Sequence, residues 1–317
     1  MKSRKSFQVL VQMDFFSKIN KNTDSTYLIA LEGLERKHDV FYCLPNDINI
    51  HQNELYVRTR KFKFKNKRFV LSQRQKILAL NDFDVIFIRQ DPPFEMNYVT
   101  NTYLHQLNKI AKGKTLYIND PQGIRDFTEK ICPLNFKGLI PSTYILNDLD
   151  DILSVIKQLG TVVIKPLYDK GGNGVHQLKK NQKDLERKIS YLTDHFKRKI
   201  IVQEFLKNVS KGDKRILFVN GQPVGAVNRV PQNNSFKANL HLGALAESTD
   251  LTKKEKKICD TLEPFFKKNG LFFVGIDIID EMLTEVNVTS PTGIVQINRL
   301  EKIKIEKILW KEIERIF

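Results

Sequence analysis

The chain has 317 residues, of which 41% are hydrophobic, and it carries a formal net charge of +16 at pH 7. This length allows two or three packed cores, and no apolar run approaches the roughly 18–20 residues that a membrane-spanning helix needs. We therefore expect a soluble, cytoplasmic protein without a membrane partner, whose charge suits anionic substrates such as nucleotides.

The first third of the chain alternates apolar runs with helical patterns. We predict strands at 7–11, 40–43, 85–88 and 115–119, and helices at 25–36 and 100–111. Strands that alternate with helices are typical of an α/β unit with a mostly parallel sheet. The turn residues at 120–123 predict that this unit ends near residue 122.

The run from Lys61 to Phe69 alternates basic and aromatic residues. Such alternation occurs in proteins that stack nucleic-acid bases, but it also occurs on a strand whose phenylalanines face the core while its lysines face water. Because the excess of lysine is spread along the whole chain, we favour an exposed strand or hairpin and expect no nucleic-acid partner.

Cysteine and histidine offer little to a transition metal. The three cysteines, Cys43, Cys132 and Cys259, are far apart and odd in number, which predicts buried thiols rather than a disulfide framework or a zinc site. The six histidines show no i,i+4 pairing. Any metal should therefore be bound by oxygen ligands.

Beyond residue 123 the pattern changes to paired strands. Apolar runs at 162–165, 175–178, 200–203, 215–219 and 223–227 predict a largely antiparallel α+β region. Asn220-Gly221, between the last two runs, is a strong hairpin signal. At the end of the chain a docked helix is predicted over 301–317, because one helical face collects Ile305, Ile308, Leu309, Ile313 and Ile316.

Acidic residues stand on an otherwise apolar pair of segments near residue 280. If 280–282 forms the tip of a hairpin, Asp277 lies opposite Glu285, and Asn287 stands beside Glu285 on the same face. Unpaired acids on an apolar face would cost several kcal/mol. Two carboxylates and one amide oxygen suit hard Mg²⁺, which completes its shell with phosphate oxygens and water. We therefore predict a metal site at these three residues.

Four cationic residues stand where an anion could bind. Lys165 ends an apolar run and precedes the glycine-bearing turn at 171–174, whose backbone N–H groups can contact phosphate. Lys130 lies in a predicted helix, and Arg215 and Arg229 lie at strand ends, where their guanidiniums suit carboxylate or phosphoryl oxygens. Each residue alone is also compatible with an ordinary surface position or salt bridge.

Taken in order, these motifs resemble the nucleotide and metal motifs of the prokaryotic glutathione synthetases, which belong to the ATP-grasp superfamily. The similar segments of the second part are 129–130, 164–167, 171–172, 203–206, 212–215, 229–232, 275–277 and 284–291. Those of the first third are 13–14, 19–20, 24–25 and 88–94. The resemblance therefore covers nearly the whole chain.

The resemblance implies a fold of two parts. An α/β, Rossmann-like substrate domain, called the pre-ATP-grasp domain, would occupy residues 1–122. An α+β ATP-grasp fold would follow, with two antiparallel sheets sandwiching ATP: a lid subdomain over 123–200 and a C-terminal subdomain with the metal site over 201–317. By the same resemblance the protein is a homo-oligomer, namely a tetramer.

The resemblance also implies an activity and roles for individual residues. The reaction would be the ATP-dependent joining of γ-glutamylcysteine and glycine to give glutathione through an acyl phosphate, with release of ADP and phosphate. The ATP-binding residues would be Lys130, Lys165, Gly171, Gly172, Gln203, Glu204, Leu206 and Asp213. Arg215 and Arg229 would be catalytic, and Arg89 and Ser290 would bind the substrate. The metal ion, Mg²⁺ or Mn²⁺, would be bound by Asp277, Glu285 and Asn287.

Two departures from the family pattern leave the substrate open. Asp169-Lys170 stands where the family often has a glycine and an apolar residue, and 239–247 lacks the glycine- and arginine-rich character of the family's loop. One alternative is an ATP-grasp ligase for a different peptide or amino acid, and another is a non-catalytic nucleotide- or nucleic-acid-binding protein. Because 231–247 has few large apolar residues, we expect it to be a mobile lid that closes over the acyl phosphate.

Overall fold

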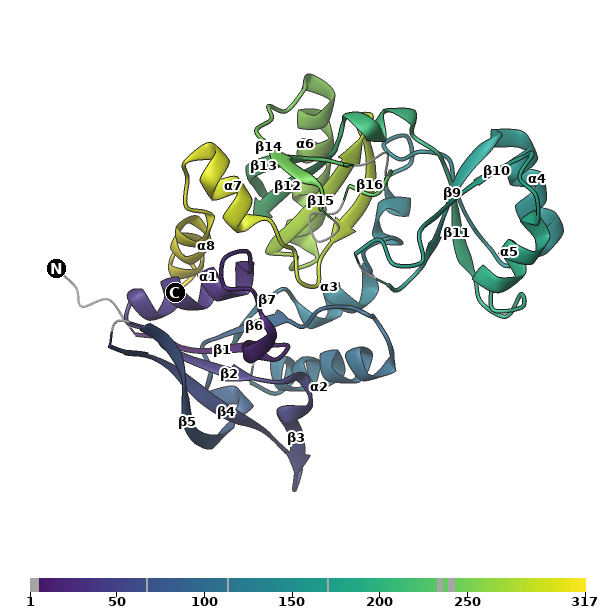
Figure 1. The fold of residues 1–317 in the computed structure, drawn as a ribbon. Helices are drawn as coiled ribbons and strands as arrows, with labels where there is room; N and C mark the ends of the chain where they lie inside the picture. Colours follow the sequence, from purple (N-terminus) through teal and green to yellow (C-terminus); the bar gives the residue numbers. More distant parts are fainter. Residues whose placement is uncertain (1–5, 67, 113, 170, 233–235, 239–242) are drawn as a thin grey trace.

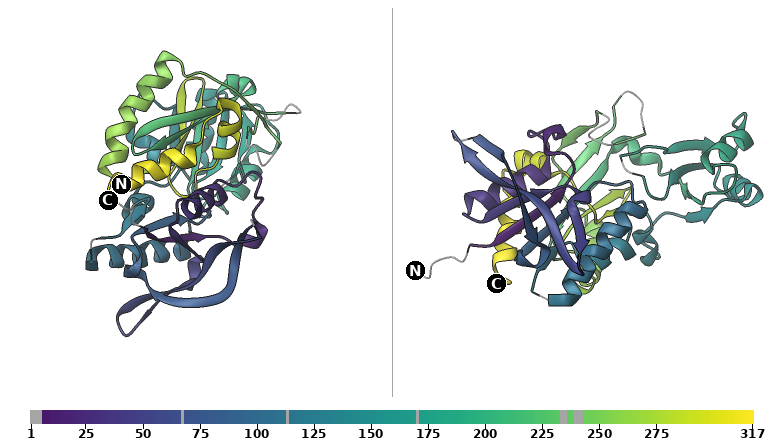
Figure 2. Two further views of the ribbon diagram at one scale, coloured as in Figure 1. Left: turned by 90° about the vertical axis from the view of Figure 1, so that its left-hand side faces the viewer. Right: turned by 90° about the horizontal axis from the view of Figure 1, so that it is seen from below.

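A computed structural model describes residues 6–66, 68–112, 114–169, 171–232, 236–238 and 243–317. Three sheets organise this part of the chain (Figure 1). A seven-stranded sheet forms the N-terminal domain, a five-stranded sheet lies above it in Figure 1, and a four-stranded sheet stands apart at the right. The right-hand view of Figure 2 shows the same separation of the four-stranded sheet from the N-terminal domain.

The N-terminal sheet has the order β3-β4-β2-β1-β6-β7, and β5 pairs with β4. The strands are β1 Gln8–Met13, β2 Asp39–Cys43, β3 Ile48–His51, β4 Glu54–Lys65, β5 Arg68–Ala79, β6 Val85–Arg89 and β7 Leu116–Ile118. Neighbours among β1, β2, β6 and β7 are parallel, which confirms the predicted α/β unit, whereas β3, β4 and β5 are antiparallel additions.

Three helices complete this domain, α1 Ser25–Glu35, α2 Met96–Lys112 and α3 Pro121–Asp126. Asp24 caps α1, because its side chain accepts a hydrogen bond from the backbone N–H of Tyr27 at 2.6 Å. The helices predicted at 25–36 and 100–111 are confirmed, although α2 begins four residues earlier than predicted. The turn predicted at 120–123 is instead the capped start of α3, since the Asp120 side chain accepts from the next backbone N–H groups.

The Lys61–Phe69 run lies in the long β4–β5 hairpin. Phe62 and Phe69 are buried, and their stacked rings lie 4.7 Å apart between centroids, as the strand interpretation predicts. Phe64 is 47% exposed, contrary to that interpretation. Two of the three phenylalanines therefore belong to the core and offer no face to a nucleic-acid base.

The second part of the chain carries the two antiparallel sheets. The four-stranded sheet has the order β10-β9-β11-β8, with strands β8 Thr143–Leu146, β9 Thr161–Pro166, β10 His176–Lys179 and β11 Ile200–Glu204, and its helices are α4 Leu149–Leu159 and α5 Leu185–Leu192. The boundary proposed at 200/201 falls at the start of β11, whose partners β8 and β9 lie in this sheet.

The five-stranded sheet has the order β14-β13-β12-β15-β16. Its strands are β12 Asp213–Val219, β13 Gln222–Val230, β14 Leu245–Glu247, β15 Phe273–Ile279 and β16 Met282–Asn287, and helix α6 Lys253–Lys268 accompanies it. The predicted hairpin at Asn220-Gly221 is confirmed, and both residues have positive φ, 50° and 79°. Such angles are typical of the tight turns that connect antiparallel strands.

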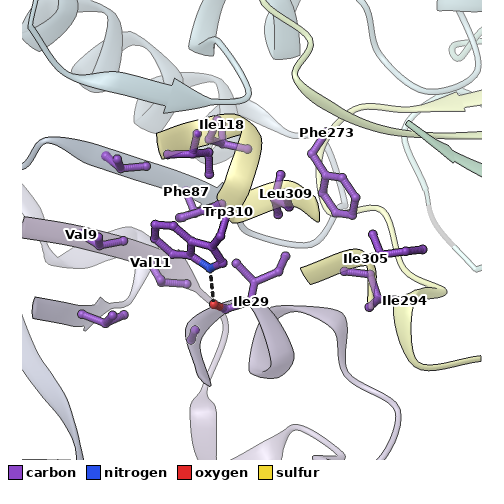
Figure 3. Close-up of a cluster of buried hydrophobic side chains, with 14 of the residues drawn as sticks. Val9, Val11, Ile29, Phe87, Ile118, Phe273, Ile294, Ile305, Leu309 and Trp310 are labelled. Atoms are coloured by element: carbon purple, nitrogen blue, oxygen red, sulfur yellow. Dashed lines mark hydrogen bonds between the residues drawn. The ribbon is translucent and has the colours of Figure 1, made fainter. Parts of the chain in front are cut away.

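The end of the chain packs back onto the N-terminal domain. The docked helix predicted over 301–317 is confirmed as α8 Ile305–Glu314, although it is shorter at both ends. A further helix, α7 Ile294–Glu301, precedes it and ends at Lys302, which adopts a left-handed conformation with φ 55°. Trp310 of α8 is fully buried, and its Nε1 donates a hydrogen bond to the carbonyl of Ile29 in α1 at 2.8 Å (Figure 3). The cluster around it joins Phe87 of β6 to Phe273 of β15 (Figure 3). This shared core connects the domains.

The cysteines behave as the sequence predicts. Cys43, Cys132 and Cys259 are free and buried, and burial raises the pKa of each thiol above its usual value. Thiolates are therefore scarce at neutral pH, and these cysteines are poor nucleophiles and metal ligands. Within the described ranges, no helix is both long enough and apolar enough to cross a bilayer.

Candidate active site

A cavity of about 470 Å³ is lined by residues of both antiparallel sheets. From the four-stranded sheet come Val163, Lys165 and Gln203. The five-stranded sheet provides the charged and polar wall, which consists of Asp213, Arg215, Arg229, Asp277, Glu285 and Asn287. Asp91 and Pro92, which follow β6 of the N-terminal domain, also line the cavity. Three sheets therefore contribute to one site.

The acidic hairpin has the predicted register. Asp280 and Glu281 form its turn, both with positive φ (52° and 57°), so that Asp277 pairs with Glu285 and Gly275 pairs with Asn287. Asp277, Glu285 and Asn287 all line the cavity. The turn is one residue shorter than the predicted tip at 280–282, and a register shift between Asp277 and Ile278 restores the predicted pairing of Asp277 with Glu285. The period-two pleat then turns the three side chains to one side.

Asp277 is only 3% exposed and lies between two arginines. Arg215 donates from Nε to Asp277 Oδ1 at 2.5 Å and from Nη2 to Oδ2 at 2.9 Å. Arg229 Nη2 lies 3.0 Å from Asp277 Oδ1 and 2.7 Å from Asp213 Oδ2. Burial opposes ionisation, but the two guanidiniums outweigh it and lower the pKa of Asp277. The carboxylate is therefore ionised and fixes both arginines in place.

Glu285 and Asn287 are less engaged. With the residues that the structure describes, the Glu285 carboxylate forms neither a hydrogen bond nor an ion pair, although it faces the cavity. Asn287 donates from Nδ2 to Asp277 Oδ2 at 3.3 Å. The described ranges hold no group of three His, Cys, Asp or Glu side chains placed to bind a metal. Two carboxylates and one amide oxygen nevertheless fit a hard cation that keeps water or substrate oxygens in its shell.

Lys165 and the glycine turn lie on the opposite side of the cavity. Lys165 Nζ donates to Gln203 Oε1 at 2.9 Å, and burial lowers the pKa of this lysine. Gly171 and Gly172 have φ of 68° and 78°, a conformation that other residues rarely adopt. The predicted ATP-binding residues that line this cavity are Lys165, Gly171, Gly172, Gln203, Glu204, Leu206 and Asp213.

Lys130 does not line the main cavity. Its Nζ donates to the carbonyl of Asp169, and the residue lies beside a smaller adjoining cavity that Glu129 also lines. The predicted helix around Lys130 is a short 3₁₀ turn that begins at Cys132. In this structure the ammonium of Lys130 is therefore held by the chain that leads into the glycine turn.

The two predicted substrate-binding residues differ in their access to the cavity. Ser290 lines the cavity, whereas Arg89 is buried behind it and donates to Thr26 Oγ1 at 3.1 Å and to the Pro291 carbonyl at 2.9 Å. Burial lowers the pKa of Arg89 to about 10. Its Nη1 is buried and has no hydrogen-bond partner among the described residues. This nitrogen is an unused donor near the Ser290 loop.

The cavity also holds residues to which the sequence assigned no role. Glu129 Oε1 accepts a hydrogen bond from Thr289 Oγ1 at 2.5 Å, and burial, with a smaller contribution from the charge of Glu285, raises the pKa of Glu129 to about 7. Lys237 Nζ donates to the carbonyl of Gly172 at 3.0 Å. The adjacency of Glu129 to Lys130 was the available signal, whereas no motif marked Lys237.

The segment expected to act as a lid, 231–247, is described only in part. Residues 233–235 and 239–242 lie outside the described residues, as does Lys170. Of the remainder, 236–238 line the cavity, and β14 pairs with β13. The mobility of the segment stays a prediction.

Two family models match this chain. The model "Prokaryotic glutathione synthetase, N-terminal domain" matches residues 7–125, and "Prokaryotic glutathione synthetase, ATP-grasp domain" matches residues 129–302. The chain is 40% identical over 310 residues to the glutathione synthetase of Bradyrhizobium diazoefficiens, covering 97% of this chain and 98% of that protein. It is 39% identical over 310 residues to the glutathione synthetase of Agrobacterium fabrum, covering 97% and 96%.

Solved structures share the fold at lower identity. The ATP-grasp ligase PsnB complexed with a minimal precursor aligns with a TM-score of 0.63 at 15% identity, covering 99% of both chains. D-alanine–D-alanine ligase from Bacillus anthracis, complexed with ATP, aligns with a TM-score of 0.59 at 14% identity, covering 98% of this chain and 97% of that one. These likenesses show the ATP-grasp fold with a preceding domain, as predicted.

Proposed function

The chain belongs to the prokaryotic glutathione synthetases, ATP-dependent ligases that make glutathione, and we propose that it does so through an acyl phosphate in a metal-assisted reaction. The observation that carries the proposal is one cavity whose polar wall combines Arg215, Arg229, Asp277 and Glu285, with Lys165 opposite. Cations facing paired carboxylates are the groups that phosphoryl transfer requires.

The chemistry follows from the poor reactivity of a carboxylate. The carboxylate of γ-glutamylcysteine attacks the γ-phosphorus of ATP, the bond between that phosphorus and the bridging oxygen breaks, and ADP leaves. The amine of glycine then attacks the acyl carbon and displaces inorganic phosphate, with loss of a proton from nitrogen. No side-chain nucleophile takes part, so positioning and electrostatics supply the catalysis.

We assign the nucleotide to the side of the cavity formed by the four-stranded sheet. The glycine turn, with its left-handed backbone, can bring N–H groups close to phosphate oxygens, and Lys165 and Lys130 add positive charge. The adenine would lie against the backbone of 203–206, where Gln203, Glu204 and Leu206 line the cavity. Asp213 is proposed to contact the nucleotide, because its buried Oδ1 lacks a hydrogen-bond partner among the described residues.

Arg215 and Arg229 are proposed to neutralise the transferred phosphoryl group and the tetrahedral intermediate. Their ion pairs with Asp277 hold them in one orientation before substrate arrives, so little reorganisation is needed during the reaction. Mg²⁺ or Mn²⁺ held by Asp277, Glu285 and Asn287 would add a Lewis acid that polarises phosphoryl oxygens. Of the three ligands, Glu285 can bind a metal without losing a contact, because its carboxylate forms no hydrogen bond or ion pair within the described part of the chain.

Arg89 and Ser290 are proposed to bind the peptide substrate. The unused Nη1 of Arg89 is a donor for a carboxylate, and Ser290 is next to Thr289, whose hydroxyl donates a hydrogen bond to Glu129.

We also propose that the enzyme works in the cytoplasm as a homo-oligomer, namely a tetramer. Its units would be the substrate domain at 1–122, the lid subdomain at 123–200 and the metal-binding subdomain at 201–317. The lid boundary would extend to 204 if it follows β11.

Release of ADP across a panel of substrates tests the assignment. With ATP and Mg²⁺, turnover should require both γ-glutamylcysteine and glycine, and mass spectrometry should identify glutathione. Other γ-glutamyl peptides and other amines provide the comparison. Preference for a different peptide or amine by a large factor would favour the alternative ligase, and absence of turnover with every pair would favour the non-catalytic alternative.

A further inference from the structure

The amine substrate of the proposed reaction carries a positive charge before it reacts. At neutral pH the amino group of glycine is an ammonium, and γ-glutamylcysteine carries a second ammonium on its glutamyl part. Moving a cation from water into a cavity is costly unless the cation meets an opposite charge. The site should therefore offer two carboxylates to these ammonium groups, besides those that hold the arginines and the metal.

Six carboxylate side chains line the cavity in the described part of the chain, namely those of Asp91, Glu129, Glu204, Asp213, Asp277 and Glu285. Asp213 and Asp277 pair with the arginines, and Glu285 is assigned to the metal. Glu204 lies at the end of the cavity assigned to the adenine. Asp91 and Glu129 therefore remain for the two ammonium groups.

Of these two residues, Asp91 lies on the side of the cavity assigned to the peptide. It follows Arg89 by two residues, and its backbone N–H donates to Asp14 Oδ2 at 3.0 Å within the N-terminal domain. Glu129 lies beyond that domain, and its carbonyl accepts a hydrogen bond from the backbone N–H of Val286 in β16 at 2.9 Å. Glu129 thus belongs to the metal-binding side of the cavity, where the acyl phosphate would form.

The Glu129 side chain is held on that side by the segment that follows β16. Its Oε1 accepts a hydrogen bond from Thr289 Oγ1 at 2.5 Å, and Thr289 is itself buried. Val286, which binds the Glu129 carbonyl, lies between the proposed metal ligands Glu285 and Asn287. The side chain and the backbone of Glu129 are therefore both fixed to the part of the chain that carries metal ligands.

The second oxygen of this carboxylate is open. Glu129 Oε2 has no hydrogen-bond or ion-pair partner among the residues that the structure describes. Thr128 and Lys130 on either side are buried, whereas Glu129 is partly exposed where it lines the cavity. The Lys130 ammonium is held by the carbonyl of Asp169 instead. An incoming ammonium can therefore bind Oε2 without displacing a donor of the described part of the chain. Burial raises the pKa of Glu129, as expected for a carboxylate without a cation in contact.

We propose that Glu129 binds the ammonium group of the amino acid that attacks the acyl phosphate. This amino acid is glycine in the proposed function, on which the assignment rests. An ammonium beside Oε2 forms a charge-assisted hydrogen bond, and its nitrogen then lies on the side of the cavity where the metal and the arginines hold the acyl phosphate. Such a carboxylate favours amino acids over uncharged nucleophiles, water among them, that also consume an acyl phosphate.

An uncharged amine tests the assignment. Hydroxylamine is largely uncharged at neutral pH, and its nitrogen attacks the acyl carbon of an acyl phosphate. The bond from that carbon to the phosphate oxygen breaks, inorganic phosphate leaves, and the nitrogen loses a proton. Glu129→Gln should lower kcat/KM for glycine by about 10- to 100-fold, the loss expected for one hydrogen bond between charged groups. Hydroxamate formation from γ-glutamylcysteine without glycine, measured by its colour with ferric ion, should remain near the wild-type rate.

Glu285→Gln is the matched control, because it is the same isosteric change of a carboxylate in the same cavity. It should lower the rates with glycine and with hydroxylamine equally, since the acyl phosphate must form before either amine reacts. Thr289→Val removes the hydrogen bond that orients Glu129. It should raise the KM for glycine by a smaller factor than Glu129→Gln and leave hydroxamate formation near the wild-type rate.

The two amines also separate this assignment from the proposed function. Equal losses with both amines in Glu129→Gln, when circular dichroism shows a folded chain, would mean that Glu129 acts in phosphoryl transfer and would overturn the assignment alone. A wild-type kcat/KM for glycine in that variant would overturn it as well. Absence of hydroxamate with the wild-type enzyme would instead overturn the acyl phosphate, and with it the step to which the assignment belongs.

Discussion

Replacing Glu285 with glutamine separates the proposed metal-binding role of this residue from any structural role. The change removes a charge and keeps the shape. Within the described part of the chain, the carboxylate of Glu285 has no hydrogen bond or ion pair to lose. Its charge also helps to raise the pKa of Glu129 and of Asp213, so it repels both. We therefore expect Glu285→Gln to leave the free energy of unfolding unchanged or to raise it by up to about 1 kcal/mol.

Turnover of the same variant should fall by at least about 100-fold, the range found when a preorganised charge or metal-supporting group is lost. Asp277→Asn is the matched control, because it also alters a proposed metal ligand. That change leaves Arg215 without its buried carboxylate partner and Arg229 with Asp213 alone, and breaking a buried pair costs about 3–5 kcal/mol. Asp277→Asn should therefore lose both stability and turnover.

Urea denaturation without nucleotide measures the first quantity, and ADP release with saturating substrates and Mg²⁺ measures the second. The reasoning predicts that only the asparagine variant shifts its denaturation midpoint strongly. An equal loss of stability in Glu285→Gln would show that its carboxylate supports the fold. Wild-type turnover in that variant would refute its role as a metal ligand.

Three further variants test other parts of the structure by urea denaturation. Burial raises the pKa of Glu129 to about 7 in the folded chain, above its usual 4.5, so the free energy of unfolding should fall as the pH rises from about 4.5 to 7. Glu129→Gln should reduce this fall. An unchanged pH profile in the variant would contradict the raised pKa. Asn119→Leu loses three hydrogen bonds of 2.6–2.8 Å, two of them to the backbone of Phe273, and should lower the free energy of unfolding by about 3 kcal/mol. Wild-type stability in this variant would show that those backbone groups find other partners. Gly33→Ala would place Cβ 2.6 Å from the ring of Trp310 and should cost about 1–3 kcal/mol; wild-type stability would mean that α8 shifts freely.

Much of the fold could be predicted because its signals are local. Buried parallel strands such as β6 appear as short apolar runs, and the Asn220-Gly221 turn selects a tight hairpin by its backbone preference alone. The full length of the β4–β5 hairpin was missed because most of its residues are polar or charged. Helix α7 was also missed, and α8 begins four residues later than predicted, after the left-handed residue Lys302, which no sequence signal marked.

In the site, too, contacts between neighbouring segments of the chain could be predicted, whereas contacts between distant segments could not. The pairing of Asp277 with Glu285 could be predicted because their strands follow one another in the chain across a short turn. The two-residue length of that turn and the register shift beside Asp277 could not be predicted. The contact of Asp277 with Arg215 could not, because it requires β12 to lie beside β15 with these two residues in register, and 62 positions separate them in the chain. Sheet order over such distances is set by packing of the whole core and not by local pattern.

The arrangement around Asp277 has a consequence for how the site can be dissected. One carboxylate is both a proposed metal ligand and the partner that orients Arg215 and Arg229, the cations that would face the phosphoryl group. A change at Asp277 therefore alters metal binding, arginine orientation and stability together, and its loss of activity has no single cause. Glu285 lies opposite on the neighbouring strand and makes none of these contacts with the described residues. It is the position at which the contribution of the metal can be measured alone.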